Sequence, residues 1–387
     1  MISIKQVSGI GLVIMAAGGF AGYMTQIGAS NALVNLGTAP LKKMKQPYLV
    51  LVMAYLLGQM MYLVIPSAAG LAMLLIVAIY PILLGVGLSR ASAAAMIATT
   101  SGITLGPTFG TSLLAAKTAG MDPTVYFVQY QLPIAVPAML AIAFTHFFVQ
   151  KYFDKKGVEQ YSDPVETAVD ESRPCPKWYA VFPLMPIALL LVFSKFGYES
   201  ITLNTFTAMM LSWVSVVFVE LARNRMPKQA LADAMVMFKK MGGMFGGIVA
   251  LIICAEFFAT GLKHSGLIDM MIQAANNQGL GMGAMTIVLT GIVGLVTFLT
   301  GSGVGAYTSF ASLAGDVAPA LGGSVAQLVT PMQFAAGMIR SMSPVAGVII
   351  IVAGAAGVSP MSIVKCTAIP MLTGVVVMVA LNFILIQ

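Results

Sequence analysis

The sequence is poor in charge, in cysteine and in histidine, and each shortage excludes a class of protein. Only 9% of the 387 residues are charged, whereas 59% are apolar; an ordinary soluble domain has roughly 25% charged residues. The three cysteines and two histidines show no spacing typical of a disulfide framework or a metal site. No H-E-x-x-H, Walker A or nucleophile–base pattern is present. The sequence therefore predicts neither an enzyme nor a bound cofactor or metal.

The chain contains many long apolar stretches. A helix that crosses a bilayer needs about 20 mostly apolar residues, and stretches of about this length recur along the chain. They cover residues 8–27, 48–65, 128–149, 178–196, 202–222, 243–262 and 366–386. One soluble core cannot hold so many apolar helices. The sequence therefore predicts an all-α polytopic membrane protein surrounded by lipid.

The net charge of +7 is not gathered on one continuous face, which argues against a nucleic-acid partner. Basic residues instead cluster between the apolar stretches, in segments 37–47, 151–177 and 223–240 and at Arg90 and Lys365. Loops rich in Lys and Arg face the cytoplasm in most membrane proteins. The chain is therefore expected to be a multi-pass protein with its charged linker, residues 151–177, in the cytoplasm.

Two parts of the chain share a pattern of prolines and glycines at a separation near 237 residues. The matched pairs are Pro107 with Pro344, Gly110 with Gly347, Gly120 with Gly357, Pro123 with Pro360 and Pro133 with Pro370. Upstream, residues 66–70 match residues 301–305 at a separation near 235. Shared prolines and glycines indicate shared breaks in the helices. The chain therefore contains an internal repeat.

The repeat predicts a first unit over residues 1–150 and a second over 178–387, joined by the linker. Segment 48–88 has basic residues at both ends, whereas its counterpart 283–322 has nearly uncharged flanks. The two units are therefore expected to have opposite orientations, as in the inverted repeats of many secondary transporters. The second unit opens with two helices that have no counterpart, so the first is expected to lack two opening helices.

Each unit is expected to contain a helical hairpin with a polar tip. The tips are residues 66–70 and 300–305, and the second is uncharged and rich in glycine, which permits close approach of the backbone to a ligand. The hairpins are predicted to be re-entrant, although arms of this length can also cross the membrane fully. The candidate substrate ligands at the tips are Ser67, Thr300, Ser302 and Gly303.

The break of the second unit, residues 340–347, holds the strongest single candidate. Arg340 lies between two apolar stretches, and a charge inside a membrane is costly enough to indicate function. Pro344 interrupts the helix, so a new helix is expected to begin near Val345 with free N–H groups. A guanidinium beside such N–H groups suits a carboxylate. The alternative is that Arg340 pairs with an internal carboxylate or reaches a membrane surface.

Hydroxyl groups near both breaks are further candidates. Ser341 and Ser343 follow the arginine, and Thr108, Thr111 and Ser112 lie in the break of the first unit, which contains no charge. These hydroxyls are expected to bind substrate or a cation, with hydrogen bonds to their own helices as the alternative.

Three titratable side chains remain. Glu256 lies within an apolar stretch and is expected to be either a proton carrier or the partner of Arg340. His146 and His264 lie near the ends of apolar stretches and are expected at the membrane interface.

Several runs of sequence resemble a known family. They are Gly18–Gly28 (GGFAGYMTQIG), Phe153–Lys156 (FDKK), Arg340–Gly347 (RSMSPVAG) and Gly357–Pro360 (GVSP). These runs are similar to those of the DcuC family of anaerobic C4-dicarboxylate transporters, part of the ion transporter superfamily. The chain departs from the family at its N-terminus, where members have further helices.

The resemblance implies exchange or efflux of succinate, fumarate or malate across a bacterial inner membrane, by a moving transport domain on a scaffold that can form a homodimer. Two other functions stay open. One is a cation/proton antiporter or basic amino-acid carrier of the same fold. The other is a truncated paralogue that does not transport.

Overall fold

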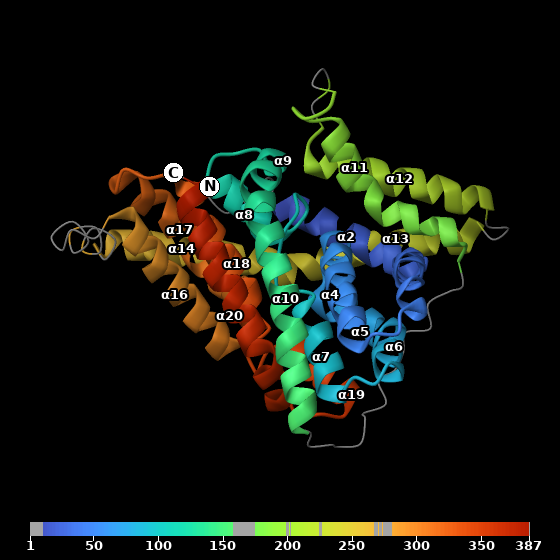
Figure 1. The fold of residues 1–387 in the computed structure, drawn as a ribbon. Helices are drawn as coiled ribbons and strands as arrows, with labels where there is room; N and C mark the ends of the chain where they lie inside the picture. The colour runs from blue at the N-terminus through green and yellow to red at the C-terminus, as the bar shows by residue number, and fades with distance from the viewer. Residues whose placement is uncertain are drawn as a thin grey trace.

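The computed structural model describes residues 11–157, 175–198, 201, 203–223, 227–266, 270, 273 and 281–386. Every regular element in these ranges is a helix, which confirms the predicted all-α class (Figure 1). Within the same ranges six helices are long and apolar enough to cross a membrane. The bent pair α2 and α3, whose axes differ by 73°, adds a seventh if it is counted as one span.

The first half of the chain consists of helices separated by short turns and by one longer break. They are α2 (Leu12–Gln26), α3 (Ala29–Thr38), η2 (Leu41–Lys43), α4 (Pro47–Val64), α5 (Ala68–Ala78), α6 (Tyr80–Gly85), α7 (Arg90–Thr99), α8 (Gly110–Thr118), α9 (Pro123–Tyr126), η3 (Phe127–Gln131) and α10 (Leu132–Lys156). The segment between α7 and α8, residues 100–109, is not helical. We call it the first break.

The helices that open the second half follow the linker. They are η4 (Lys177–Leu184), α11 (Met185–Val192), α12 (Thr205–Arg223), α13 (Pro227–Met244), η5 (Phe245–Val249) and α14 (Ala250–His264). The remaining helices are α16 (Met282–Thr300), α17 (Gly303–Ala320), α18 (Val325–Arg340), α19 (Gly347–Ala356) and α20 (Pro360–Leu385). We call residues 341–346, between α18 and α19, the second break.

The helix bounds repeat at the separations that the sequence indicates. Helices α4 and α16 begin at Pro47 and Met282, near 235 residues apart, and α8 and α19 begin at Gly110 and Gly347, near 237 apart. Each half thus contains a hairpin, a broken helix and a long final helix. The opposite orientation of the two halves and the re-entrance of the hairpins stay predictions.

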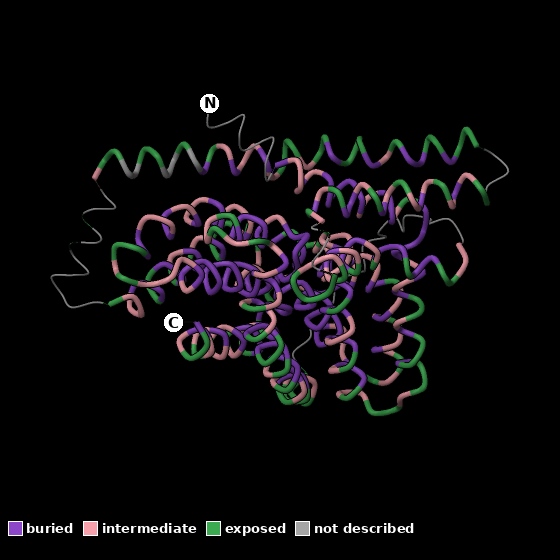
Figure 2. Tube along the Cα trace, turned by 90° about the horizontal axis from the view of Figure 1, so that it is seen from above, coloured by how far each residue is buried: buried purple, intermediate pink, exposed green. Residues whose placement is uncertain are grey.

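The two halves interlock. Helices α10 and α20, the last of each half, pack against each other through the middle of the molecule (Figure 1). Helix α8 of the first half packs on α17 and α18 of the second, and α19 packs on α5 and α7. Figure 2 shows the buried residues gathered where these helices meet, whereas the long outer helices alternate between buried and exposed turns. The two breaks therefore lie within one shared core.

One predicted span is shorter than expected. The apolar stretch 178–196 forms η4 and α11, and their combined length, Lys177–Val192, places it among the shorter apolar helices. Pro183 lies inside η4 and Pro186 in the first turn of α11. Proline removes a backbone donor, which favours the short 3₁₀ start over one long α-helix.

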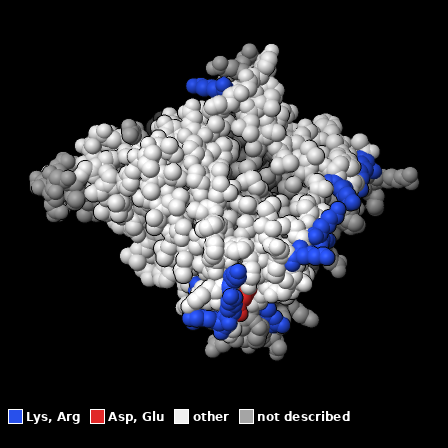
Figure 3. Space-filling view, in the orientation of Figure 1, with Lys and Arg blue, Asp and Glu red and all other residues white. Residues whose placement is uncertain are grey.

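Basic side chains on one face of the molecule lie mainly at its margins. Figure 3 shows that the Lys and Arg side chains visible on this face lie mainly along its lower and right margins, while its centre is nearly free of them. Lys155 and Lys156 in the last turn of α10 belong to the basic margin. An uncharged middle is what a bilayer-spanning surface requires.

Candidate functional site

The second break begins and ends as the prolines and glycines indicate, with one difference. Helix α18 ends at Arg340, and the next helix begins at Gly347 rather than near Val345 as expected. Pro344 lies inside the break, where its missing N–H costs no helical hydrogen bond. Arg340 is therefore the last residue of one half-helix and faces the break that precedes the next.

Arg340 joins the second break to the first. Its Nη2 donates to the carbonyl of Ser101 at 2.6 Å and contacts the hydroxyl of Tyr62 at 3.4 Å. Its Nε is buried and has no partner among the described residues. A guanidinium has five N–H donors, so donors remain for a ligand. The alternative partner, Glu256, has a side chain outside the described residues.

Two serines fix the second break against its neighbours. Ser341 and Ser343 are fully buried, and their hydroxyls donate to the carbonyls of Ala98 at 3.1 Å and Phe298 at 2.6 Å. These carbonyls belong to α7 and α16. Each hydroxyl has only one proton to donate, so in this conformation both serines hold the break in place.

The serines of the hairpin tips cap helices. Ser67 accepts a hydrogen bond from the N–H of Gly70, and Ser302 accepts one from the N–H of Gly305, both at 3.1 Å. Both contacts are N-caps, at the starts of α5 and α17. The two side chains are exposed, so a ligand can reach them.

Glycines of the second tip permit its close packing on the second break. A Cβ on Gly303 would lie 2.5 Å from the carbonyl oxygen of Ala336, and one on Gly301 would lie 2.8 Å from Cα of Ala346. Gly301 also has a φ of +71°, which favours glycine. Thr300 is exposed and donates to a carbonyl one turn earlier in α16. The second tip and the start of α19 are therefore neighbours.

The helices that follow the two breaks begin without a side-chain cap, as α4 and α16 also do. Serine side chains cap five core helices, at Ser67, Ser89, Ser302, Ser324 and Ser359. Helices α8 and α19 instead begin after Phe109 and Ala346, with no side-chain cap. The first N–H groups of a helix have no intrahelical partner and carry partial positive charge. Each break therefore ends at a helix start that can receive an anion.

The backbone of the first break is held by glutamine side chains. Gln59 of α4 donates to the carbonyl of Ile103 at 2.7 Å and accepts from its N–H at 3.3 Å. Gln131 of η3 accepts from the N–H of Gly106 at 3.0 Å. Both glutamines are fully buried. These bonds replace the helical hydrogen bonds that the break lacks.

Gln333 of α18 is the centre of this network. Its amide donates to the carbonyl of Thr104 at 2.8 Å and to the hydroxyl of Ser112 at 2.9 Å. Its oxygen accepts from Tyr126 and from Gln131, both at 3.1 Å. None of the three glutamines is among the candidates that the sequence indicates. The sequence feature that could have identified them is an amide side chain within a largely apolar stretch. Inside a membrane such a side chain needs a hydrogen-bond partner.

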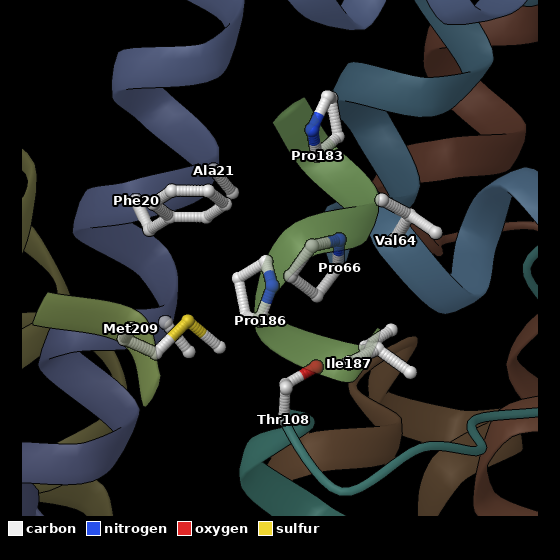
Figure 4. Close-up of a pocket in the computed structure, with 10 residues that line it drawn as sticks. Phe20, Ala21, Val64, Pro66, Thr108, Pro183, Pro186, Ile187 and Met209 are labelled. Atoms are coloured by element: carbon white, nitrogen blue, oxygen red, sulfur yellow. The ribbon is translucent and has the colours of Figure 1, made fainter. Parts of the chain in front are cut away.

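Thr108 lies in the first break, and Thr111 lies in the first turn of α8. Thr108 lines a space of about 10 Å³, enclosed by Pro66, Pro186 and Ile187 among others (Figure 4). A cavity needs about this volume to hold a single water. Thr111 has a buried hydroxyl without a partner among the described residues. Among the described residues neither threonine is a hydrogen-bond partner of Arg340.

The expectation for His146 is wrong. This side chain is fully buried, and its Nε2 and Nδ1 lie 3.0 Å from the Thr99 hydroxyl and the Gln150 amide. Gln150 also donates to the carbonyl of Cys366. The network joins α7, α10 and α20, and the apolar sequence around His146 gave no sign of these partners. His264 is exposed, as expected.

A larger cavity, of about 180 Å³, lies between α8, α14 and α17. Its lining residues are Leu114, Lys117, Thr118, Ile252, Thr308 and Ser312. None of them is a hydrogen-bond partner of Arg340 or of the serines in the second break. In the described ranges no three His, Cys, Asp or Glu side chains converge as metal ligands do.

Solved structures with this architecture are transporters. The YdaH transporter of Alcanivorax borkumensis has a TM-score of 0.65 at 14% identity, with 99% of this chain and 87% of that chain covered. MtrF of Neisseria gonorrhoeae, from a class of antimetabolite efflux pumps, has a TM-score of 0.56 at 14% identity, with 99% and 83% covered. At this identity the likeness shows the fold alone.

Other proteins have higher sequence identity to this chain than these solved structures do. A Vibrio cholerae protein named probable anaerobic C4-dicarboxylate transporter DcuC is 36% identical over 98% of this chain and 82% of its own length. The anaerobic C4-dicarboxylate transporter DcuC of Escherichia coli K12 is 34% identical over 96% of this chain and 79% of its own. The family model for DcuC, C4-dicarboxylate anaerobic carrier, matches residues 2–387. The chain therefore belongs to the DcuC family.

Proposed function

We propose that this chain is a secondary transporter of C4-dicarboxylates such as succinate, fumarate and malate, which it exchanges or exports across a bacterial inner membrane. Three findings support the proposal: the family match over residues 2–387, the names of the relatives, and six helices able to cross a membrane. They describe a carrier and not an enzyme.

The observation on which the site depends is the guanidinium of Arg340 at the junction of the two breaks. One nitrogen is bound to a backbone carbonyl of the first break, and a buried second nitrogen has no partner among the described residues. A carboxylate matches the planar fork of a guanidinium. The uncapped start of α19 follows in the same break and also favours an anion. We therefore assign one substrate carboxylate to Arg340.

The second carboxylate is assigned to the second hairpin tip. Thr300 and Ser302 are exposed there, and Gly303 allows the tip to pack against α18. Ser341, Ser343 and Ser67 would join the site by exchanging their present hydrogen bonds for bonds to substrate. Thr108 and Thr111 are assigned to neutral contacts on the side of the first break, which contribute little to substrate affinity.

The orientation and movement follow from the charge distribution. We place the basic margin and the linker, residues 151–177, in the cytoplasm, and the two halves in opposite orientations. The hairpins and broken helices then move as one transport unit. Helices α11 to α14 form the scaffold, through which two copies pair as a homodimer.

Proton coupling is assigned to Glu256 on α14, because a carboxyl group within an apolar helix can take up and release a proton. Glu256→Gln removes the titration and keeps the shape of the side chain. We expect this variant to lose the pH dependence of succinate transport while retaining exchange at fixed pH. An unchanged pH profile would exclude the assignment.

Transport in proteoliposomes tests the proposed function. Wild type is expected to exchange labelled succinate, with competition by fumarate and malate but not by lysine or sodium. Arg340→Ala is expected to lose at least about tenfold in exchange rate, since a hydrogen bond to a charged group contributes about 1.5–3 kcal/mol. Arg340→Lys keeps the positive charge but loses the planar fork of the guanidinium. Its exchange rate should therefore lie between those of wild type and Arg340→Ala.

Unchanged exchange in both arginine variants would remove Arg340 from the site. Exchange of lysine or a cation in place of succinate would favour the other class of carrier. The melting temperature of each variant in detergent shows whether a loss of transport reflects a loss of fold.

A further inference from the structure

Tyr62 is a buried polar residue beside Arg340 that the proposed site does not include. It lies in the last turn of α4, on the arm that leads to the first hairpin tip. Its hydroxyl oxygen is 3.4 Å from Nη2 of Arg340, which belongs to the other half of the chain. Only 3% of the surface of Tyr62 is exposed. A hydroxyl at this depth needs hydrogen-bond partners, so its partners indicate its role.

The hydroxyl of Tyr62 has a proton that no described residue accepts. A tyrosine hydroxyl can both donate and accept, whereas a guanidinium can only donate. Towards Arg340 the hydroxyl is therefore an acceptor, and the contact is long, because N–H···O hydrogen bonds usually measure about 2.7–3.2 Å. In the part of the chain that the structure describes, Tyr62 has no other hydrogen bond. Its proton is available for an anionic oxygen.

Arg340 directs one edge of its guanidinium towards Tyr62. The N–H groups of Nε and Nη2 form one fork, on which a carboxylate can place one oxygen at each nitrogen. In this fork Nε is buried and has no partner among the described residues, and Nη2 donates to the carbonyl of Ser101 at 2.6 Å through one of its two N–H groups. A carboxylate oxygen about 2.8 Å from Nη2 can also lie within about 3 Å of the Tyr62 hydroxyl.

The first break holds the ring of Tyr62 in place. The ring packs edge-on against Phe109, with centroids 4.8 Å apart and an interplanar angle of 62°. One turn earlier in α4, a Cβ on Gly58 would lie 2.4 Å from Cγ2 of Thr100, so this helix lies directly against the break. The hydroxyl is therefore fixed at the junction of the two breaks. A donor fixed in this way loses little freedom when a ligand binds, which favours affinity.

We propose that Tyr62 is a substrate-binding residue, whose hydroxyl donates to the carboxylate that Arg340 binds. The inference rests on the proposed function, because it adds a ligand to the same site. One carboxylate then receives Nε and Nη2 from the second half and the hydroxyl from the first. Arg340 is partly exposed, so the carboxylate approaches from the exposed side of the guanidinium. Donors around both oxygens select a carboxylate over an amide, whose NH₂ group cannot accept.

Tyr62→Phe tests the inference, because it removes the hydroxyl and keeps the ring that packs on Phe109. In proteoliposomes we expect the KM for labelled succinate to rise at least about tenfold, since a hydrogen bond to a charged group is lost. The maximal exchange rate should change by less than about threefold. Tyr55→Phe is the matched control, two turns earlier on α4. The hydroxyl of Tyr55 is buried without a partner among the described residues, so its removal should leave KM unchanged.

Equilibrium binding of labelled succinate in detergent separates direct contact from an effect through Arg340. In an Arg340→Lys background, adding Tyr62→Phe is expected to weaken binding by a further threefold or more, roughly, because the hydroxyl still contacts the substrate. Equal binding with and without Tyr62→Phe in this background would overturn the inference, since the tyrosine would then act only by positioning the guanidinium.

A KM for Tyr62→Phe equal to that of Tyr55→Phe would also overturn the inference. In that case the proposed function stands as long as wild type exchanges succinate. A wild type that neither binds nor exchanges succinate contradicts the proposed function and the inference together. The melting temperatures of both tyrosine variants in detergent should match that of wild type. If Tyr62→Phe melts lower, its succinate binding at a temperature where it remains folded decides the outcome.

Discussion

The two breaks occupy matching places in the two halves but are stabilised in different ways. Buried glutamines from α4, η3 and α18 hold the first break, and its backbone groups are their partners. The second break is fixed by two serine hydroxyls and carries the arginine. The position that matches Arg340 in the first half is Ile103, whose backbone Gln59 binds. From this comparison we propose that the first break is a support and the second a binding element.

The largest effect is expected from Gln333→Leu. This change leaves the carbonyl of Thr104 without its buried donor and one N–H of Gln131 without its buried acceptor, at about 1–3 kcal/mol for each unsatisfied group. We expect a loss of about 2–5 kcal/mol in stability and a clearly lower melting temperature in detergent. Gln327→Leu, on the same helix but outside the network, is the control. A melting temperature equal to that of the control would show that the first break is not held in this way.

Gly337→Ala should have the next largest effect, because the added methyl group would push α18 away from the backbone of the first break. A Cβ at this position would lie 2.3 Å from the carbonyl oxygen of Gly102, so α18 must shift. Overpacking of this kind costs about 1–3 kcal/mol. Gly347→Ala has nothing within 4 Å of its Cβ and should change stability by less than about 0.5 kcal/mol. Equal melting temperatures for the two variants would contradict the close packing.

The smallest effect is expected from Ser343→Ala in the second break. It removes one hydrogen bond, to the carbonyl of Phe298, which contributes about 1 kcal/mol. The melting temperature should fall only slightly. A fall as large as that of Gln333→Leu would mean that the second break is as rigidly held as the first.

Features that depend on neighbouring residues were predictable from the sequence. Proline and glycine act on the local backbone, so Pro344 and the repeated glycines located both breaks to within a few residues. Arg340 was recognisable because a charge stands out in an apolar stretch. The apolar lengths predicted most of the spans. The serine caps were also accessible in principle, because a cap involves an N–H only three residues away, as in Ser302 and Gly305.

Features that depend on distant residues were not predictable. Gln333 and Thr104 are 229 residues apart, and His146 and Thr99 are 47 apart. No periodicity brings such pairs together before the helices have packed. The polar cavity is of the same kind, since α8, α14 and α17 each contribute only a few of its lining residues.

The central claim is that the second break binds the substrate and the first supports it. Succinate exchange by Arg340→Ala beside Thr108→Val, reconstituted at equal density in the same liposomes, tests it most directly. We predict a loss of at least about tenfold for Arg340→Ala and exchange within about twofold of wild type for Thr108→Val, whose hydroxyl lines a space of only about 10 Å³. Near-normal exchange by Arg340→Ala together with its loss in Thr108→Val would contradict the account.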